Sequence, residues 1–388
     1  MKNFTFHNPT ELIFGKGQIK KLGDKLEEYG ENVLLVYGQG TIKKIGVYDE
    51  VITYLRDAGK NVVELSGIKP NPRLESVEKG INLCEENNID LILAVGGGST
   101  IDASKAISCG FYYEGATWEM IEKDGEFNQS IPLGVILTVA ATGSEMNGNS
   151  VITNWESKEK LAIHESVYPS FSILDPVYTY TLPREYTAYS IIDIAAHVYE
   201  QYFSHTPGTP MVDRWAEGIL QTLHQDSYNV LENTEDYEAR ANIMLCSTMA
   251  LNGLIGMGKE NDMASHAIEH EISAIYDIPH GAGLSIVFPN WMKYVLEEGI
   301  DKFAQYARRV FRVNDSGKTE REVALEGINQ TREWFNQMGA PSTLNDFDIG
   351  QEHLEKMAEK AVKNGKIGSY KKLGKTDVLN ILKMCLEE

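Results

Sequence analysis

Short apolar runs separated by helical patterns fill the first half of the chain, and they constrain the fold more than any other feature. The expected strands are residues 33–37, 61–65, 91–95 and 134–138. The helical patterns between them cover about 47–59, 73–87 and 101–108. Each run is short, largely aliphatic and followed by loop residues, which is typical of a buried parallel strand. Alternating strands and helices predict a parallel sheet covered by helices on both faces.

The pattern changes after about Pro183, where long amphipathic segments replace the apolar runs. Helices are expected over 188–203, 211–230, 237–257 and 263–276. The sequence therefore predicts an α/β domain over residues 1–180, followed by an all-helical domain over residues 181–388. We find neither an internal repeat nor an extended linker in the sequence.

The charge balance excludes several classes of partner. The 388 residues include 36 Lys and Arg against 56 Asp and Glu, which gives a net charge of −20. Such an acidic chain lacks the basic face that nucleic acids and anionic membranes require. No apolar run approaches the ~20 residues of a membrane span, and residues 1–10 do not resemble a signal peptide, so we expect a cytoplasmic protein. The four cysteines are widely spaced and predict neither disulfides nor a thiolate metal site.

Two glycine-rich loops directly follow expected strands. Gly96–Ser99 separates one strand from a helix that has Asp102 in its first turn, and Gly38–Gly40 follows another strand. Glycines let the backbone approach a diphosphate, and the N–H groups at a helix start attract its negative charge. A triple glycine also occurs in ordinary tight turns, and GGGS lacks the full dinucleotide fingerprint. Two such loops at strand ends nevertheless favour nucleotide binding.

Histidines and one aspartate form a second group, in the helical half. Asp193 and His197 are spaced i, i+4, so both side chains project from one helix face. His266, His270 and His280 follow within 15 residues of one another. One carboxylate with several imidazoles suits Zn²⁺ or Fe²⁺, which accept both oxygen and nitrogen ligands. The alternative for any single histidine is an ordinary hydrogen-bonded core or surface residue.

The segment His266–His270 also matches HxxEH, the zinc motif of one metalloprotease class. In that interpretation His266 and His270 would bind zinc, and Glu269 would be the general base. The motif is short, and it explains neither the glycine loops nor the Asp193 and His197 pair. A metalloprotease is therefore a remote alternative.

Taken together, these segments resemble the iron-dependent alcohol dehydrogenase family, in particular its butanol dehydrogenase and aldehyde reductase branch. The resemblance runs through residues 8–17, similar to the family's opening hairpin, 96–102, 138–145, Asp175-Pro176, 181–183 and both histidine segments. It implies a Rossmann-like dinucleotide-binding domain followed by an all-α metal-binding domain, which is the dehydroquinate synthase-like fold. It also implies a homodimer.

By the same resemblance, four side chains would bind the metal: Asp193, His197, His266 and His280. His270 would face the same site without binding the ion, as a proton relay or a nicotinamide contact; the alternative is that it only stacks within the site. If all four side chains bind, the substrate needs a fifth position, which Fe²⁺ accepts more readily than Zn²⁺. We therefore expect Fe²⁺ in the cell, with Zn²⁺ as a possible occupant.

The resemblance places the cofactor on the α/β domain. Gly97, Gly98 and Ser99 would hold the diphosphate, with Asp102 behind them. The other implied cofactor residues are Gly38, Gln39, Gly40, Asn71, Thr138, Thr142, Asn147, Lys160 and Tyr178. In members that prefer NAD an aspartate commonly follows the first strand, whereas this chain has Gly38 there. The cofactor is therefore expected to be NADP(H) rather than NAD(H), although Gln39 adds no positive charge.

The implied activity is hydride transfer between NADP(H) and a short-to-medium-chain aldehyde or primary alcohol such as butanal or butanol. A polyol dehydrogenase of glycerol or propanediol type is the alternative within the fold, and a cyclase acting on a sugar-acid phosphate is a further one. The segments 190–201 and 264–282 contain no Lys or Arg, which favours a neutral substrate over a phosphorylated one. A nucleotide-binding sensor without catalysis would have no use for the histidine group.

Overall fold

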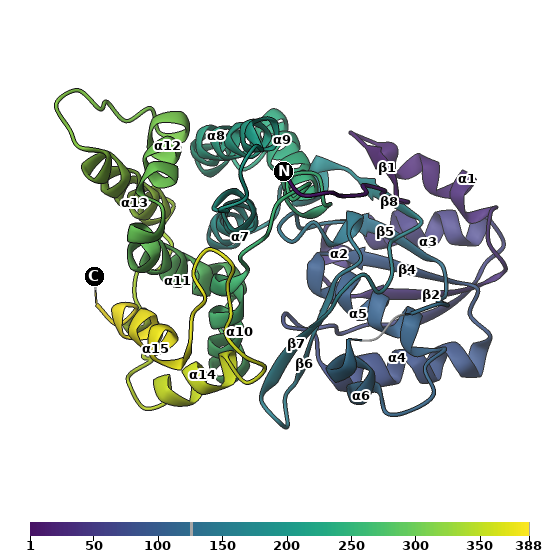
Figure 1. Ribbon diagram of the computed structural model, residues 1–388. Helices are drawn as coiled ribbons and strands as arrows, with labels where there is room; N and C mark the ends of the chain where they lie inside the picture. The colour runs from purple at the N-terminus through teal and green to yellow at the C-terminus, as the bar shows by residue number, and fades with distance from the viewer. Residues whose placement is uncertain (125–126, 388) are drawn as a thin grey trace. The chain divides into compact units, whose positions relative to one another are not determined.

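The computed structural model describes residues 1–124 and 127–387. It divides into two compact units (Figure 1). The helical unit contains Met1–Phe6, Pro183–Thr234 and Met249–Glu388, and the α/β unit contains His7–Leu182 and Glu235–Thr248. The chain therefore changes unit after Phe6 and again after Leu182, and the segment Glu235–Thr248 returns to the α/β unit.

A six-stranded parallel sheet with the strand order β1-β8-β5-β4-β2-β3 forms the centre of the α/β unit. Its strands are β1 (Glu11–Phe14), β2 (Asn32–Tyr37), β3 (Asn61–Leu65), β4 (Leu91–Gly96), β5 (Leu133–Leu137) and β8 (Phe171–Leu174). All four strands predicted from the apolar runs are confirmed. In the centre of the sheet Val33 pairs with Leu91, and Tyr37 pairs with Val95.

Helices cover both faces of this sheet, as the alternating pattern predicts. They are α1 (Leu22–Leu26), α2 (Thr41–Lys44), α3 (Val47–Asp57), α4 (Leu74–Asn87), α5 (Gly98–Gly110) and α6 (Thr117–Lys123). Successive strand residues point to opposite faces, so β2 contributes to two cores. Leu34 and Val36 pack with α4 and α5, whereas Val33 and Leu35 pack with α1 and α3. The buried cysteines Cys84 and Cys109 are free thiols within the first of these cores.

Two expectations for the α/β unit are wrong in detail. Residues 8–17 do not form a hairpin: β1 is a single strand that pairs in parallel with β8, and positive φ angles at Gly15 and Gly17 lead the chain into the 3-10 turn Gln18–Lys21. Helix α5 begins at Gly98, three residues earlier than the apolar pattern indicates. The sequence analysis also missed the antiparallel pair β6 (Ser150–Asn154) and β7 (Glu159–Ile163).

The helical unit is built from α7 (Arg184–Tyr202), α8 (Pro210–Glu232), α10 (Ala264–Tyr276), α11 (His280–Val295), α12 (Ile300–Val310), α13 (Glu320–Gln337), α14 (Leu354–Ala361) and α15 (Lys375–Met384). The helix expected over 237–257 is α9 (Tyr237–Leu251), which begins in the α/β unit and stops six residues early. Gly253 then has a φ of 90°, a left-handed conformation that ends the helical path. In the described part of the chain, none of the helices combines the length and apolarity needed to cross a bilayer.

Aromatic side chains fix helix α7 within the helical unit. Phe203, just beyond the helix, stacks on Phe303 with ring centroids 4.3 Å apart, and Tyr199 stacks on Phe288 at 4.9 Å. The Tyr199 hydroxyl also bonds that of Tyr306 at 2.8 Å. Because aromatic pairs contribute beyond the area they bury, this cluster sets the position of α7.

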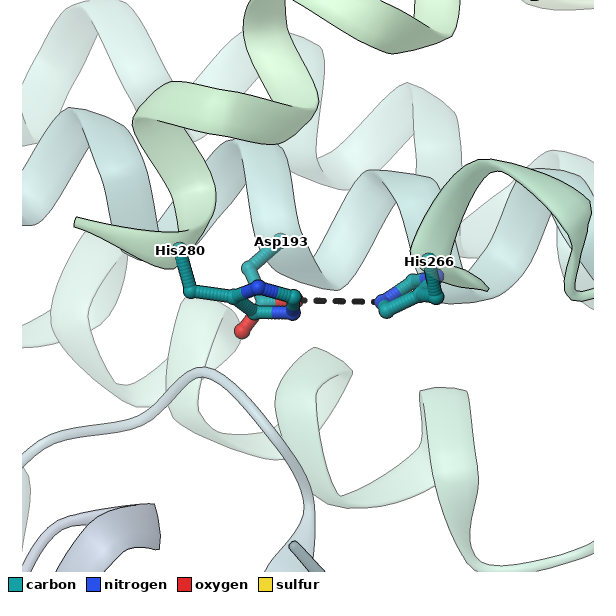
Figure 2. A group of neighbouring side chains, drawn as sticks. All are labelled: Asp193, His266 and His280. Carbon is teal, nitrogen blue, oxygen red and sulfur yellow. Dashed lines mark ion pairs between the residues drawn. The ribbon is translucent and has the colours of Figure 1, made fainter. Parts of the chain in front are cut away.

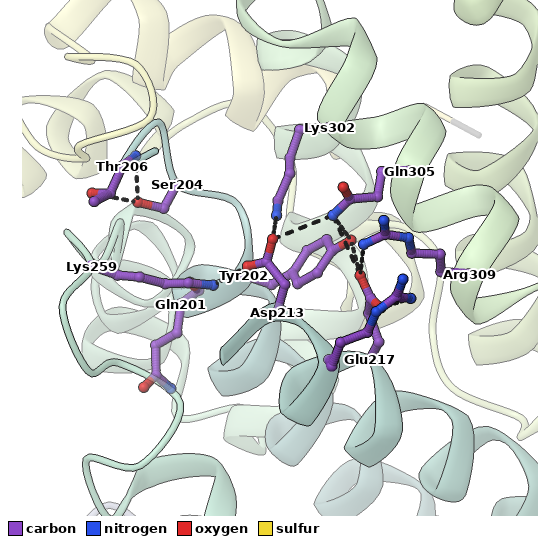
Figure 3. Close-up of polar contacts among 11 residues, drawn as sticks. Gln201, Tyr202, Ser204, Thr206, Asp213, Glu217, Lys259, Lys302, Gln305 and Arg309 are labelled. Atoms are coloured by element: carbon purple, nitrogen blue, oxygen red, sulfur yellow. Dashed lines mark hydrogen bonds and ion pairs between the residues drawn. The ribbon is translucent and has the colours of Figure 1, made fainter. Parts of the chain in front are cut away.

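A charged network lies beside the aromatic cluster (Figure 3). Asp213 accepts hydrogen bonds from Lys259 at 2.5 Å and from Lys302 at 2.6 Å. Glu217 accepts from the Tyr202 hydroxyl at 2.9 Å. The ammonium of Lys302 also lies 3.9 Å from the centre of the Tyr202 ring. These contacts connect α8 and α12 to the end of α7.

A buried lysine organises the loops of the α/β unit. Lys105 on α5 is completely buried, and its ammonium donates to Ser144 Oγ at 2.8 Å, Asn147 Oδ1 at 3.1 Å and the Asn149 carbonyl at 2.8 Å. Ser144 in turn donates to Asp102 at 2.6 Å. Burial raises the pKa of Asp102, and the charge of Lys105 opposes that rise. One cation thus connects α5 to the loop that follows β5.

We predict that Lys105→Met lowers the free energy of unfolding of the α/β unit by about 3–5 kcal/mol, because the buried Asp102 loses its compensating charge. Urea unfolding followed by circular dichroism measures the change. Lys123→Met is the control, since Lys123 is exposed and pairs with Glu119 on the surface of α6. Equal stability of the two variants would contradict this view of Lys105.

Candidate functional site

The carboxyl edge of the parallel sheet contains a switch point between β2 and β4. These strands are neighbours, yet the chain leaves β2 for β3 on one side and leaves β4 for β5 on the other. Ligands of open α/β sheets bind where the connections diverge in this way. The predicted loops Gly38–Gly40 and Gly97–Ser99 leave the sheet at this point.

Close packing explains the glycines of the second loop. A Cβ atom on Gly98 would lie 2.4 Å from Thr142 Oγ1, and one on Gly97 would lie 2.8 Å from Val139 Cβ. Only glycine therefore lets the start of α5 approach the loop after β5. Gly97 is the N-cap of α5, a helix of 13 residues, so the predicted diphosphate loop lies at a helix N-terminus.

Most of the other predicted cofactor residues follow strands of the parallel sheet, and one lies on β7. Asn71 follows β3 with a φ of 51°, and Thr138 and Thr142 follow β5. Lys160 lies on β7, where its charge acts on Asp102. Tyr178 lies after β8, and its hydroxyl donates to Glu50 on α3 at 3.0 Å.

The side chains of two predicted cofactor residues form hydrogen bonds within the protein. Asn147 donates to the Thr142 and Gly143 carbonyls at 3.3 and 2.9 Å and accepts from Lys105. Asp102 accepts from Ser144 and from the Val151 N–H. Both side chains hold the loop after β5 in place. The sequence analysis missed Lys105, whose position within the first turns after the glycine loop was the available signal.

The histidine group is assembled by three helices of the helical unit. Asp193 and His197 lie one turn apart on α7, His266 and His270 lie one turn apart on α10, and His280 is the first residue of α11. Asp193, His197 and His266 are nearly fully buried. The structure therefore brings together all five residues that the sequence analysis selected, from segments up to 87 residues apart in the chain.

Two glycines allow α11 to approach the other helices. A Cβ atom on Gly281 would lie 2.1 Å from the Tyr189 carbonyl oxygen of α7, and one on Gly283 would lie 2.7 Å from Cγ of Glu269 on α10. These approaches carry His280 toward α7 and α10. Close helix packing thus explains why positions 281 and 283 are glycines.

Asp193 Oδ1 is the common neighbour of the imidazoles (Figure 2). It lies 3.6 Å from His266 Nε2, 3.7 Å from His280 Nε2 and 3.3 Å from His197 Nδ1. Nitrogen and oxygen ligands about 2.0–2.2 Å from a shared tetrahedral ion are separated by about 3.4 Å, so these are separations expected of metal ligands. Among the described residues, single ligand atoms of Asp193, His266 and His280 lie within 4.8 Å of one another.

Three buried atoms of this group have no hydrogen-bond partner among residues 1–124 and 127–387: Asp193 Oδ1, His197 Nδ1 and His266 Nε2. An unpaired buried polar atom normally costs about 1–3 kcal/mol, so three at one point require a ligand to satisfy them. A divalent cation bound by one carboxylate and several imidazoles would do so. The residues therefore fit a metal ion.

Electrostatics at the site support this fit. Burial alone would raise the pKa of Asp193, but His197, His280 and His266 lower it instead, so the carboxylate is charged. Burial lowers the pKa of His197 to about 4, which keeps that imidazole neutral and able to bind a metal. Burial would also lower the pKa of His266, but Glu200 and Asp193 outweigh it and raise the value to about 10. A metal must therefore displace a proton from His266.

His270 lies beside the ligand group rather than within it. Its ring centre is 6.4 Å from that of His266 and 5.5 Å from that of His280. A ligand atom of His270 instead groups with Glu269 and His280. His270 thus lies next to His280 in the same unit, and its role as a proton relay or a nicotinamide contact stays a prediction.

The structure gives Glu269 partners that differ from those of a protease base. Its carboxylate accepts from His280 Nδ1 and from Ser273 Oγ. A second buried carboxylate, Glu200, which the sequence analysis missed, accepts from His266 Nδ1. The signal was available, because Asp193, His197 and Glu200 follow i, i+4, i+7 along a helix whose other buried positions are mainly apolar.

Comparison with known proteins assigns most of the chain to one family. The family described as iron-containing alcohol dehydrogenase matches residues 9–176, and its C-terminal counterpart matches residues 187–386. The probable NADH-dependent butanol dehydrogenase 1 of Bacillus subtilis is 50% identical over 100% of both chains. The NADPH-dependent aldehyde reductase YqhD of Escherichia coli is 38% identical over 94% of both chains.

A solved structure, that of NADH-dependent butanol dehydrogenase A from Thermotoga maritima, superposes with a TM-score of 0.95 at 39% identity. The match covers 100% of this chain and 99% of that one. The likeness therefore extends over the whole fold described above.

We predict that Zn²⁺ raises the melting temperature of the metal-free protein, because a ligand that binds only the folded state stabilises it, by about 2.7 kcal/mol at a concentration near 100 times Kd. The affinity should rise with pH, about tenfold per unit below the pKa of His266, as the displaced proton becomes easier to remove. Scanning calorimetry with and without metal measures both effects. Asp193→Ala should abolish the shift; an unchanged shift would place the metal elsewhere.

Proposed function

Because the chain belongs to the iron-containing alcohol dehydrogenase family, we propose that it transfers hydride reversibly between NADP(H) and a short-to-medium-chain aldehyde or primary alcohol such as butanal or butanol. The observation that carries the proposal is the convergence of Asp193, His266 and His280. Beside it stand three buried atoms without a hydrogen-bond partner among the described residues, on Asp193, His197 and His266. The named relatives support both the alcohol dehydrogenase and the aldehyde reductase direction.

Asp193, His197, His266 and His280 would hold the metal, which we propose to be Fe²⁺ in the cell. When bound, a divalent ion supplies Lewis-acid polarisation of the substrate carbonyl. The chain contributes the charge of Asp193 and the burial that keeps water away from it. Full activity of a zinc-loaded, iron-free preparation would contradict the preference for iron.

In this proposal, backbone groups of the α/β unit bind the cofactor. The N–H groups at the start of α5 would bind the diphosphate, because the partial positive charge of a helix N-terminus attracts anions. The loop after β5, held by Lys105 and Asn147, would line the remaining cofactor surface. The net charge of −20 is then no obstacle, since fixed local dipoles attract the anionic cofactor.

Gly38 supports NADP(H) in this proposal. A Cβ atom at this position would lie 3.5 Å from the Ile68 carbonyl, an ordinary contact, so the backbone does not require glycine there. The absence of a carboxylate leaves space for a 2′-phosphate. The relatives carry both cofactor names, NADH in the Bacillus enzyme and NADPH in the Escherichia enzyme, so both cofactors enter the test.

The proposal predicts that metal-loaded protein consumes NADPH in the presence of butanal, and that omission of the metal removes the activity. Loss of reduced-nicotinamide absorbance measures the rate, with NADH, glycerol and propanediol as comparison arms. Metal-treated Asp193→Ala is the negative control. Absence of turnover with every short aldehyde and both cofactors would overturn the proposal.

His270 would supply the proton that the alkoxide product needs, directly or through water and the cofactor ribose, because imidazole exchanges protons near neutral pH. We predict that His270→Gln lowers kcat by about 10²-fold or more. Zinc affinity, measured by chelator competition, should stay unchanged. Loss of the metal in this variant would instead make His270 a ligand.

The homodimer implied by the resemblance remains part of the proposal. Light scattering at working concentration would test it.

A further inference from the structure

Two fully buried carboxylates lie directly behind the imidazoles of the candidate metal centre. Glu200 on α7 contacts Nδ1 of His266, and Glu269 on α10 contacts Nδ1 of His280. In both cases the other ring nitrogen, Nε2, is the atom that approaches Asp193. Two histidines from different helices therefore share one arrangement, with a carboxylate at Nδ1 and the metal side at Nε2.

We propose that Glu200 and Glu269 are positioning residues that hold the protons of His266 and His280 on Nδ1, so that both Nε2 atoms present lone pairs to the metal. A charged carboxylate only accepts hydrogen bonds, so it selects the tautomer that has Nδ1–H. A histidine ligand oriented in this way binds a metal more tightly. The inference rests on the metal centre of the proposed function.

Glu200 also caps the N-terminus of α10, and this second role decides which substitution can test it. Its Oε1 accepts from the backbone N–H groups of Ser265 and His266 at 2.9 and 3.2 Å, and its Oε2 accepts from His266 Nδ1. These two N–H groups belong to the first turn of α10, where no partner exists within the helix. One carboxylate thus caps α10 and orients the histidine that α10 carries.

A glutamine at position 200 cannot do both tasks. Its single oxygen can cap the two N–H groups, but its NH₂ group then faces His266 Nδ1 and favours the tautomer with the proton on Nε2. In that tautomer Nε2, the nitrogen on the metal side, has no lone pair to offer the metal. The opposite orientation leaves the N–H groups of α10 facing an NH₂ group.

A glutamine at position 269 keeps its hydrogen bonds. Its oxygen can accept from His280 Nδ1, while its NH₂ group donates to Ser273 Oγ, which can accept as well as donate. Methionine, which has a similar length, offers no acceptor to His280. The two glutamate sites therefore respond differently to the same isosteric change.

The experiment measures the Zn²⁺ affinity of the full-length, metal-free protein by competition with a chromophoric chelator. We expect Glu200→Gln to weaken binding by about 10–100-fold, the range seen when such supporting residues are removed. Glu269→Met should weaken it by a similar factor, whereas Glu269→Gln should stay within a few-fold of the wild type. Recovery by glutamine at position 269 is a result that a purely packing role would not produce.

A control variant separates positioning from stability. Glu217→Gln changes a buried carboxylate in the network of Figure 3, where Glu217 accepts from the Tyr202 hydroxyl. It should lower the melting temperature of the metal-free protein without changing zinc affinity.

The outcomes distinguish this inference from the proposed function. Failure of the wild type to bind zinc would overturn the metal centre itself. Tight binding by the wild type together with unchanged affinity in Glu200→Gln would overturn only the positioning role. If Glu200→Gln does not fold, the Glu269 pair decides, because equal affinity of Glu269→Met and Glu269→Gln would contradict the inference.

Discussion

A buried negative charge at Asp193 is the constraint on which the helical unit depends. A carboxylate removed from water is costly, and here imidazoles from three helices surround it. Histidines are suitable neighbours because they are polar without requiring a permanent charge. The arrangement is satisfied when a cation takes the place that the unpaired atoms surround. The same residues therefore determine both the chemistry of the site and the packing of α7, α10 and α11.

Regular patterns made much of the fold predictable. Strands β2, β3, β4 and β5 and both layers of helices follow from short aliphatic runs and periodic helices, because burial on two faces leaves few other arrangements. Strand β8, which lies between β1 and β5, was missed. The hairpin β6–β7 was missed, since its residues mix polar and apolar types without a clear period. The start of α5 was placed too late because glycines normally weaken a helix, whereas here they bring it close to Thr142 and Val139.

The candidate site was predictable to the extent that its residue types were unusual. Asp193 and the histidines stand out on apolar helices, and the structure brings them together. The signals for Glu200 and Lys105 were weaker, because in a chain with 56 acidic and 36 basic residues a single charged side chain is most often a surface group. Complete burial, which only the folded structure reveals, marks these two as part of the framework.

The aromatic cluster around α7 has a consequence beyond stability. This helix carries Asp193, His197 and Glu200 along one stripe, while Tyr202 near its end packs away from that stripe among rings and charges. A helix that turns about its own axis moves every residue on the stripe together. The aromatic packing around α7 therefore fixes the rotation of this helix about its axis. Substitutions among these rings are compatible with the site only in combinations that leave that rotation unchanged.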